Sequence, residues 1–298
     1  MLEISHSSTS IARGCWQKYY WHYIEGLKPK RTSNAMQLGS VIHEAFEGFY
    51  AGLDDSTVMD GIRAKYDNLI GETQDMGEQE LLALDSYTAQ GMWGSYPHKD
   101  RSVFDSIECE KEFSITLPNL RKVRFVGRVD GLVKIDGLWW VREMKTTGLS
   151  PRQFIGRCNT SMQASGYVYA MRKMGYPVQG VIYDVIKRPL LRKRQNERVE
   201  DFGKRIVIDY QEDAKKPQQE RKAYVQHTEY RPQYMIDQWV DSQVKLTSEI
   251  RYRRRKNDWF RNADQCWNFN SLCPYSKLCH VERADQLTKD AFFTKEVR

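Results

Sequence analysis

The chain has 298 residues, of which 40% are hydrophobic and 29% charged, and this composition indicates a folded globular protein rather than a disordered one. The formal net charge is +7 and the sequence pI is about 9.0, which favours a polyanionic partner. No apolar run reaches the roughly 18 residues of a membrane span, and the N-terminus lacks a signal-peptide pattern. We therefore expect a cytoplasmic protein with no membrane partner.

The first strong pattern along the chain is an apolar stripe at helical spacing. Asn34 is a residue type that caps helices, and the helix that follows it carries His43. The side chains expected on the buried face of this helix are Leu38, Val41, Ile42, Ala45, Phe46 and Phe49.

The period then changes from that of a helix to that of a strand. Apolar and polar residues alternate from Val103 to Leu117, which predicts a long, half-buried strand. A second strand is predicted from Val123 to Lys134 and a third from Leu138 to Lys145. The dipeptide Asp136-Gly137 between them is a strong signal for a tight turn, so we expect a β-hairpin.

The second half of the chain continues the alternation of helix and strand. One helix is predicted from Pro151 to Met174, with Gly175 as its stop, and a strand from Val178 to Ile186. Residues 191–219 are charged and poorly periodic, which indicates a strand-joining excursion or a basic flap. A last helix is predicted from Met235 to Arg255. Its expected buried face is Met235, Trp239, Val240, Val244, Leu246 and Ile250.

Three charged residues of the predicted hairpin suggest chemistry. Glu143 and Lys145 are two apart in one strand, so their side chains leave the same face, and the hairpin brings Asp130 beside them. Two converging carboxylates repel unless a cation lies between them, and Mg²⁺ or Mn²⁺ prefers such oxygen ligands. With the ammonium of Lys145 nearby, this set suits phosphodiester hydrolysis by activated water. The alternative is ordinary surface charge, with Glu143 and Lys145 in a weak ion pair.

These residues belong to a wider pattern of four short stretches followed by three cysteines. The stretches are Gly39-Ser-Val-Ile-His43, Gly127-Arg-Val-Asp130-Gly, Glu143-Met-Lys145-Thr-Thr and Gln163-Ala-Ser-Gly-Tyr167. In order, spacing and predicted setting the chain resembles the RecB-like branch of the PD-(D/E)XK nucleases, specifically its members with an iron-sulfur cluster. The resemblance implies an α/β fold with a restriction-endonuclease-like core, in which helices flank a mixed central sheet. It also implies additional N- and C-terminal helical regions that the cluster joins.

The resemblance also assigns roles to individual residues. It implies that the metal is held by His43, Asp130, Glu143 and the backbone carbonyl of Met144, and that the catalytic residues are Asp130, Glu143, Lys145, Gln163 and Tyr167. Gln163 and Tyr167 are four apart, so both point to one side of their helix. In this family the pair supports the active site and contacts the substrate backbone. The alternatives are a satisfied core histidine at His43 and simple packing of Tyr167.

Four cysteines form a second constellation. Cys266, Cys273 and Cys279 are separated by six and five residues, and Cys15 lies in the N-terminal stretch Gly14-Cys-Trp-Gln-Lys-Tyr-Tyr. Closely spaced cysteines in a cytoplasmic protein favour metal ligation, and spacing alone does not separate Zn²⁺ from an iron-sulfur cluster. The resemblance favours [4Fe-4S], in which one early and three late cysteines close the fold.

One departure from the family pattern concerns the late cysteines. The family usually has two residues between the first two of them, whereas six separate Cys266 from Cys273. His280, next to Cys279, is the alternative ligand. Cys109 and Cys158 have no such neighbours and are interpreted as a buried apolar residue and an incidental thiol.

Basic and aromatic runs carry weaker hypotheses. The candidate DNA contacts are Lys187, Arg188, Arg192, Lys193 and Arg194 after one strand, and Arg251, Arg253, Arg254 and Arg255 at the end of the last helix. Such runs are also typical of solvated surface. The aromatic cluster of Trp16, Tyr19, Tyr20, Trp21 and Tyr23 suits either stacking on single-stranded DNA or core packing.

The sequence therefore predicts one RecB-like nuclease domain over residues 1–298. Its parts are an N-terminal helical region (1–100), a catalytic core (101–187), a basic excursion with strands (188–230) and a C-terminal helix and cysteine region (231–298).

No phosphate-binding loop of an ATP motor is present in the sequence. By analogy with the family we expect a stand-alone exonuclease that acts on DNA ends in recombination, repair or replication, in the host cytoplasm if it is encoded by a phage. The alternatives are a structure-specific or single-strand endonuclease of the same fold, and a catalytically inactive DNA-binding iron-sulfur module. Recombination or replication proteins, or a second copy of the chain, are the expected protein partners.

Overall fold

The structure is a computed structural model that describes residues 1–30, 33–268, 271–281 and 285–296. The chain divides into two compact units. The first unit comprises Met1–Thr32, Phe113–Gly127 and Tyr234–Arg298, and the second comprises Ser33–Glu112 and Arg128–Gln233. The single domain expected over residues 1–298 stays a prediction.

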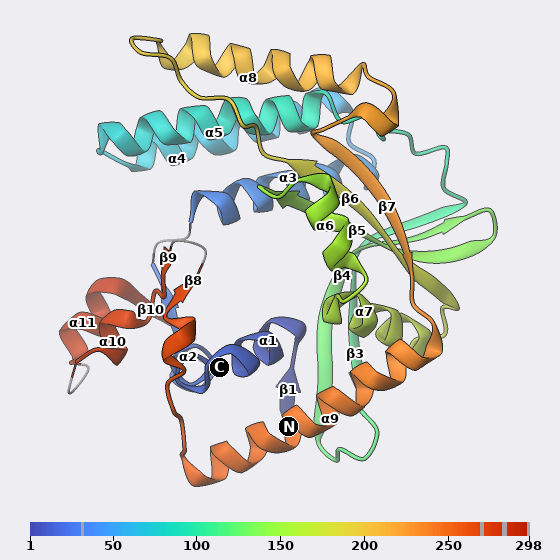
Figure 1. Ribbon diagram of the computed structural model, residues 1–298, viewed down its shortest axis with the longest axis vertical. Helices are drawn as coiled ribbons and strands as arrows, with labels where there is room; N and C mark the ends of the chain where they lie inside the picture. Colours follow the sequence, from blue (N-terminus) through green and yellow to red (C-terminus); the bar gives the residue numbers. More distant parts are fainter. Residues whose placement is uncertain (31–32, 269–270, 282–284, 297–298) are drawn as a thin grey trace. The chain divides into compact units, whose positions relative to one another are not determined.

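A mixed sheet forms the centre of the second unit (Figure 1). β4 pairs antiparallel with β5, β5 pairs parallel with β6, and β6 pairs antiparallel with β7, while β3 also pairs with β4. The strands are β3 (Ser106–Thr116), β4 (Val123–Ile135), β5 (Leu138–Thr147), β6 (Val178–Lys187) and β7 (Tyr224–Tyr230). The predicted α/β class with a mixed central sheet flanked by helices is confirmed.

The β4–β5 hairpin forms as the sequence predicts. Asp136 and Gly137 have φ angles of 49° and 77°, the left-handed pair that a tight hairpin turn requires. The Gly137 amide also donates to Asp105 Oδ2 at 2.8 Å, which holds the turn. The ladder runs from Ile135↔Leu138 to Gly131↔Arg142. The strand predicted over Val103–Leu117 is shorter in the structure, because β3 begins only at Ser106.

Helices pack on one another around a large apolar core in the second unit. They are α3 (Asn34–Tyr50), α4 (Asp55–Glu72), α5 (Met76–Gly94) and α8 (Val199–Ala214), and Figure 1 shows α4, α5 and α8 lying side by side. All six apolar residues predicted for the buried face of α3 are buried. The cap of α3 differs from the prediction: Ser33, not Asn34, accepts the Met36 amide, so the helix begins one residue after its true cap.

One other prediction about a helix was wrong. The single helix expected over residues 151–174 is two, α6 (Pro151–Cys158) and α7 (Met162–Lys173), because the Ser161 side chain accepts the Ala164 amide and starts a new helix. The predicted stop at Gly175 is confirmed by its φ of 96°. The excursion predicted at residues 191–219 joins β6 to β7, and the sequence did not show that it contains the helix α8, whose apolar face packs against α5, and the 3₁₀ turn η2 (Gln218–Glu220).

The first unit contains the two ends of the chain. From the N-terminal end come β1 (Leu2–Ile4), α1 (His6–Gly14), α2 (Trp16–Tyr19), the π-helix η1 (Tyr20–Ile24) and β2 (Leu27–Pro29). From the C-terminal end come α9 (Gln233–Lys256), η3 (Ala263–Gln265), β8 (Trp267–Asn268), β9 (Ser271–Leu272), α10 (Ser276–Cys279), α11 (Gln286–Phe292) and β10 (Phe293–Lys295). β1 pairs parallel with the start of β4, and β10 pairs antiparallel with β2.

Helix α9 is confirmed, but its buried face differs from the predicted one. The buried residues are Ile236, Trp239, Gln243, Thr247 and Ile250, whereas Met235, Val240, Val244 and Leu246 are only half-buried. The prediction followed apolar residues alone, and two polar side chains occupy the buried stripe. No helix in the described part of the chain is long and apolar enough to cross a membrane.

Candidate active site

The point where β4 and β5 part holds the predicted carboxylates. The hairpin ladder ends at the pair Gly131↔Arg142, and Asp130 and Glu143 are the next residues of their strands. Asp130 Oδ2 accepts the backbone amide of Met144 at 2.9 Å, so this carboxylate occupies the space that opens where the ladder stops. The sequence prediction that the hairpin brings Asp130 to Glu143 agrees with this geometry.

Glu143 is buried beside the ammonium group of Lys145. Lys145 Nζ lies 2.5 Å from Glu143 Oε1, while Glu143 Oε2 has no hydrogen-bond partner in the described part of the chain. The side chain of Glu143 is only 2% exposed. Burial raises the pKa of Glu143 to about 7, with a further contribution from Asp130, although Lys145 acts in the opposite sense. A buried carboxylate oxygen without a partner is costly, and a bound cation would remove that cost.

Helix α3 brings His43 to the same place. His43 Nδ1 lies 3.4 Å from Asp130 Oδ2. Burial alone would lower the pKa of His43, but the adjacent Asp130 carboxylate outweighs it and the pKa is raised. Burial alone would raise the pKa of Asp130. His43, Lys145 and the Met144 amide outweigh this effect and hold the pKa of Asp130 below its usual value.

The donor set fits a hard divalent ion. One imidazole and two carboxylates converge, and one carboxylate oxygen is unpartnered. No three such side chains form a ready-made ligand group in the described residues. Lys145 pairs with Glu143, and His43 with Asp130. A metal ion would compete with these neighbours for the carboxylates. That the Met144 backbone carbonyl is a metal ligand stays a prediction.

Gln163 and Tyr167 lie together on α7. The Gln163 amide donates to the Tyr167 hydroxyl at 2.9 Å. Burial raises the pKa of Tyr167, and the charges of Glu143, Lys145 and Asp130 also act on it, which places the phenol close to the acidic residues. Tyr167 therefore stays a neutral hydrogen-bond donor at physiological pH. The helical spacing that predicted this pair is confirmed, but its catalytic role is not tested by the geometry.

A buried ion pair beneath the site was not predicted. Arg142 Nε lies 2.5 Å from Asp184 Oδ2, and both side chains are almost fully buried. The guanidinium also lies 4.5 Å from the ring centroids of Phe46 and Tyr50 on α3, the helix that carries His43. This contact ties the histidine helix to the strand of Glu143. The sequence places Arg142 and Asp184 in the two strands without indicating that they pair.

Comparison with known proteins agrees with this arrangement. The family model described as PD-(D/E)XK nuclease superfamily matches residues 3–280.

The chain belongs to the PD-(D/E)XK nuclease superfamily.

Nucleases of this superfamily are metal-dependent and generally use Mg²⁺ or Mn²⁺, and they act on DNA. The predicted superfamily is therefore confirmed, whereas the RecB-like branch stays a prediction. No curated protein matches the sequence.

The protonation of Glu143 leads to a first testable expectation about this superfamily site. The pKa of Glu143 is about 7 against an ordinary 4.5, and that of His43 is also raised, so the folded protein binds more protons here than the unfolded chain. The metal-free protein is thus expected to lose stability as the pH rises from about 5 to 8. Because metal must displace these protons, its apparent affinity should rise over the same range.

Thermal melts in EDTA and in Mn²⁺ at pH 5.5 and pH 8.0 measure both effects. The melting temperature in EDTA should fall with pH, and the stabilisation by Mn²⁺ should be larger at pH 8.0. Glu143→Gln is the matched control, because it removes the titrating carboxyl and should reduce both trends. Identical pH trends in wild type and Glu143→Gln would contradict the assignment.

The cysteines of the first unit also converge. Burial raises the pKa of Cys279, and the charges of Cys15, Cys266 and Cys273 raise it further, so the four thiols lie within electrostatic reach of one another. Two of the sulfurs accept N–H bonds: Cys15 from the Asn262 amide at 3.4 Å and Cys279 from Trp21 Nε1 at 3.3 Å. A cavity of about 310 Å³ is lined by Cys15 and Cys273.

The structure explains the unusual spacing of the late cysteines. Two short strands, β8 and β9, lie between Cys266 and Cys273 and pair antiparallel, with Trp267 opposite Leu272. The Cys273 amide donates to the Cys266 carbonyl at 2.7 Å, so the two cysteines are neighbours in spite of the six residues between them. In the described residues, the four sulfurs do not form the tight group that a single metal ion would need.

The predicted DNA-contact residues have unequal surroundings. The side chain of Arg253 is only 12% exposed, lies over the rings of Trp16 and Phe260, and pairs with Glu249 and Asp258. This position suits packing rather than phosphate contact. Lys193 pairs with Glu80, Arg251 donates to the Arg121 carbonyl, and Arg192, Arg194, Arg254 and Arg255 are exposed.

The aromatic cluster is engaged mainly in packing. Tyr19 is buried, and its ring stacks on Trp259 at 5.9 Å and lies 5.2 Å from that of Tyr23. These contacts favour the core-packing interpretation over base stacking.

Proposed function

We propose that this chain is a stand-alone, metal-dependent exonuclease that hydrolyses phosphodiester bonds from DNA ends. The observation that carries the proposal is the buried, unpartnered oxygen of Glu143 at the point where Asp130 and Lys145 meet it. Membership of the superfamily supports the metal dependence and the nuclease activity in this proposal. Action on ends, and a place in recombination, repair or replication, extend the resemblance to the RecB-like branch.

We assign the metal to His43, Asp130, Glu143 and the Met144 carbonyl. Bound there, a divalent ion supplies Lewis-acid stabilisation of phosphoryl charge and makes water more acidic. Lys145 keeps its proton, because the nearby carboxylates raise its pKa, so its ammonium can orient the attacking water and offset negative charge as the bond breaks. Tyr167, held by Gln163, can donate to a phosphate oxygen and fix the strand.

For the first unit we propose a [4Fe-4S] cluster held by Cys15, Cys266, Cys273 and Cys279. Its support is the convergence of four thiols from both ends of the chain, the cavity beside them and the two N–H···S bonds, which are typical of thiolates in such clusters. Zinc is the alternative occupant.

A substrate without ends separates an exonuclease from an endonuclease. With Mn²⁺ present, we expect linear single- or double-stranded DNA to be degraded, and circular single-stranded DNA to stay intact. The matched control is the same circle after a single cut, which should be degraded like other linear DNA. Cleavage of the uncut circle at a comparable rate would show an endonuclease instead.

A further inference from the structure

A basic cavity of about 290 Å³ lies in the second unit, where the strand β6 ends. Its wall comes from three places in the chain: the end of β6 and the segment after it, helix α8, and the segment before β7. The lining residues that matter here are Lys187, Arg188, Tyr210, Asp213, Lys216 and Lys222. Such a volume is at the low end of the roughly 300–1,000 Å³ of small-molecule sites, and suits a phosphate with its adjoining sugar.

The charges around the cavity do not cancel. Asp213 accepts the backbone amides of Lys222 and Ala223 at 2.9 and 2.7 Å and pairs with Lys216 at 3.1 Å, so its charge is already compensated. Among the described residues, no carboxylate forms an ion pair with Lys187, Arg188 or Lys222, which also line the cavity, and Asp85 acts on Arg188 only electrostatically. The other lining carboxylate, Asp209, is exposed to solvent on α8. The cavity thus presents a surplus of positive charge.

The cavity is fixed to the strand that carries the catalytic residues. The Arg188 amide donates to the carbonyl of Thr147, the last residue of β5, at 2.7 Å. Thr147 comes two residues after Lys145. A side-chain carbon built on Gly148 would lie 3.4 Å from Arg188 Nη2, so the guanidinium lies over the loop that leaves β5. On the α8 side, the Tyr210 hydroxyl donates to the Lys187 carbonyl at 2.8 Å.

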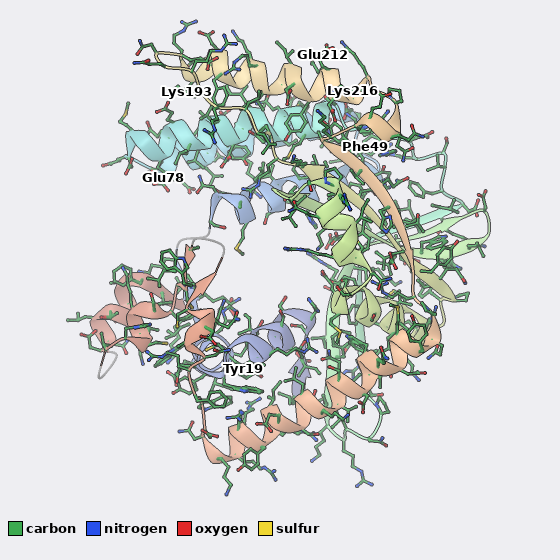
Figure 2. All side chains as sticks on the ribbon, viewed as in Figure 1. Tyr19, Phe49, Glu78, Lys193, Glu212 and Lys216 are labelled. Atoms are coloured by element: carbon green, nitrogen blue, oxygen red, sulfur yellow. The ribbon has the colours of Figure 1, made fainter. Side chains whose placement is uncertain are left out.

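Basic residues near the two ends of α8 differ in whether they line the cavity. Figure 2 labels Lys216, which follows α8 and lines the cavity, and Lys193, which lies toward the other end of that helix. Lys193 is paired with Glu80 and is not part of the cavity. The basic run of the sequence therefore splits into cavity residues at its start and surface residues farther along.

We propose that this cavity binds a phosphate group of the DNA strand. An arginine fork with two unpaired lysines is the set of donors that phosphate oxygens prefer. The proposal rests on the proposed function and adds a second anchoring point for the substrate. The phosphate comes either from the end of a strand or from its interior.

Binding is measured best in an Asp130→Asn background, where DNA is not cut. Fluorescence anisotropy with a labelled oligonucleotide gives the affinity at several salt concentrations. Arg188→Gln and Lys222→Gln should each weaken binding by about tenfold and reduce the salt slope by about one. Lys204→Gln, which removes an equal charge from an exposed position of α8 outside the cavity, should change the affinity less than about twofold.

The substrates identify the source of the phosphate. If the cavity variants bind more weakly only to DNA whose ends carry a 5′- or 3′-phosphate, the cavity binds a terminal phosphate. If they bind equally more weakly to DNA with hydroxyl ends and to circular DNA, the cavity binds an interior phosphate. Lys222 is exposed, so Lys222→Gln is expected to melt like the wild type, and Arg188→Lys tests the fork while keeping the charge.

Two results would overturn the proposal or separate it from the nuclease assignment. Cavity variants that bind like Lys204→Gln show that the cavity holds no phosphate. A wild type that never cuts DNA, yet loses binding in the cavity variants, refutes the proposed function and leaves the phosphate cavity standing.

Discussion

Replacement of Lys145 by alanine is expected to slow DNA hydrolysis by roughly a hundredfold to a thousandfold, the usual loss when one charged stabiliser is removed from an active site. Lys145 is the cation bonded to Glu143, and its side chain is partly exposed, so substrate can reach it. Asp130→Asn should cost at least as much, because it removes a charge that attracts the metal while keeping an acceptor for the Met144 amide. Single-turnover cleavage of end-labelled DNA in Mg²⁺ or Mn²⁺ measures both effects.

The matched control for these variants is Lys134→Ala. Lys134 lies in the same hairpin and packs near the ring of Trp139, and in the described part of the chain no ion pair joins it to Asp130 or Glu143. It should leave the cleavage rate within about twofold of wild type, in keeping with the small effect of surface charges. The site assignment fails if Lys145→Ala and Asp130→Asn cut DNA as fast as Lys134→Ala does.

Loss of one proposed cluster cysteine is expected to unfold the first unit. Metal sites that hold a fold together contribute about 10 kcal/mol or more, which is comparable to the whole stability of a domain, about 5–15 kcal/mol. Cys15 comes from the N-terminal helices and Cys273 from the C-terminal hairpin, so either change opens a loop of most of the chain. Cys15→Ala and Cys273→Ala should therefore lose brown colour and solubility together when purified anaerobically.

The two remaining cysteines provide the control. Cys109 and Cys158 lie in the second unit, and Cys109→Ala and Cys158→Ala should keep the colour of the wild type. Metal analysis and the visible absorption spectrum identify the occupant. Colourless wild-type protein with one equivalent of zinc would replace the iron-sulfur cluster by a zinc site, and retention of full colour in Cys15→Ala would exclude that residue as a ligand.

The parts of the site that follow from local geometry were predictable. A turn dipeptide with two positive φ angles fixes the hairpin register, and register alone places Asp130 beside Glu143 and Lys145. The spacing of Gln163 and Tyr167 needed only the helical repeat. His43 could be placed on its helix, but its position beside Asp130 came from the family resemblance.

Features that depend on packing between distant segments were not predictable. The apolar face of α8 is hidden among charges, and only its contact with α5 shows that residues 199–214 form a helix. The ion pair of Arg142 with Asp184 joins residues 42 apart along the chain, and no local pattern indicates which partner each one finds. The break between α6 and α7 depends on one serine cap, which competes with continued helical hydrogen bonding.

The paired strands β8 and β9 bring Cys266 and Cys273 close together although six residues separate them in the sequence. In an antiparallel pair of strands, the hydrogen bonds fix the distance between residues that lie opposite each other. This distance does not depend on how many residues lie between them along the chain. The distance between the Cys266 and Cys273 backbones is therefore set by the pair Trp267↔Leu272 and the hydrogen bond beside it. The number of residues between Cys266 and Cys273 along the sequence is therefore a poor guide to how near the two cysteines lie in space.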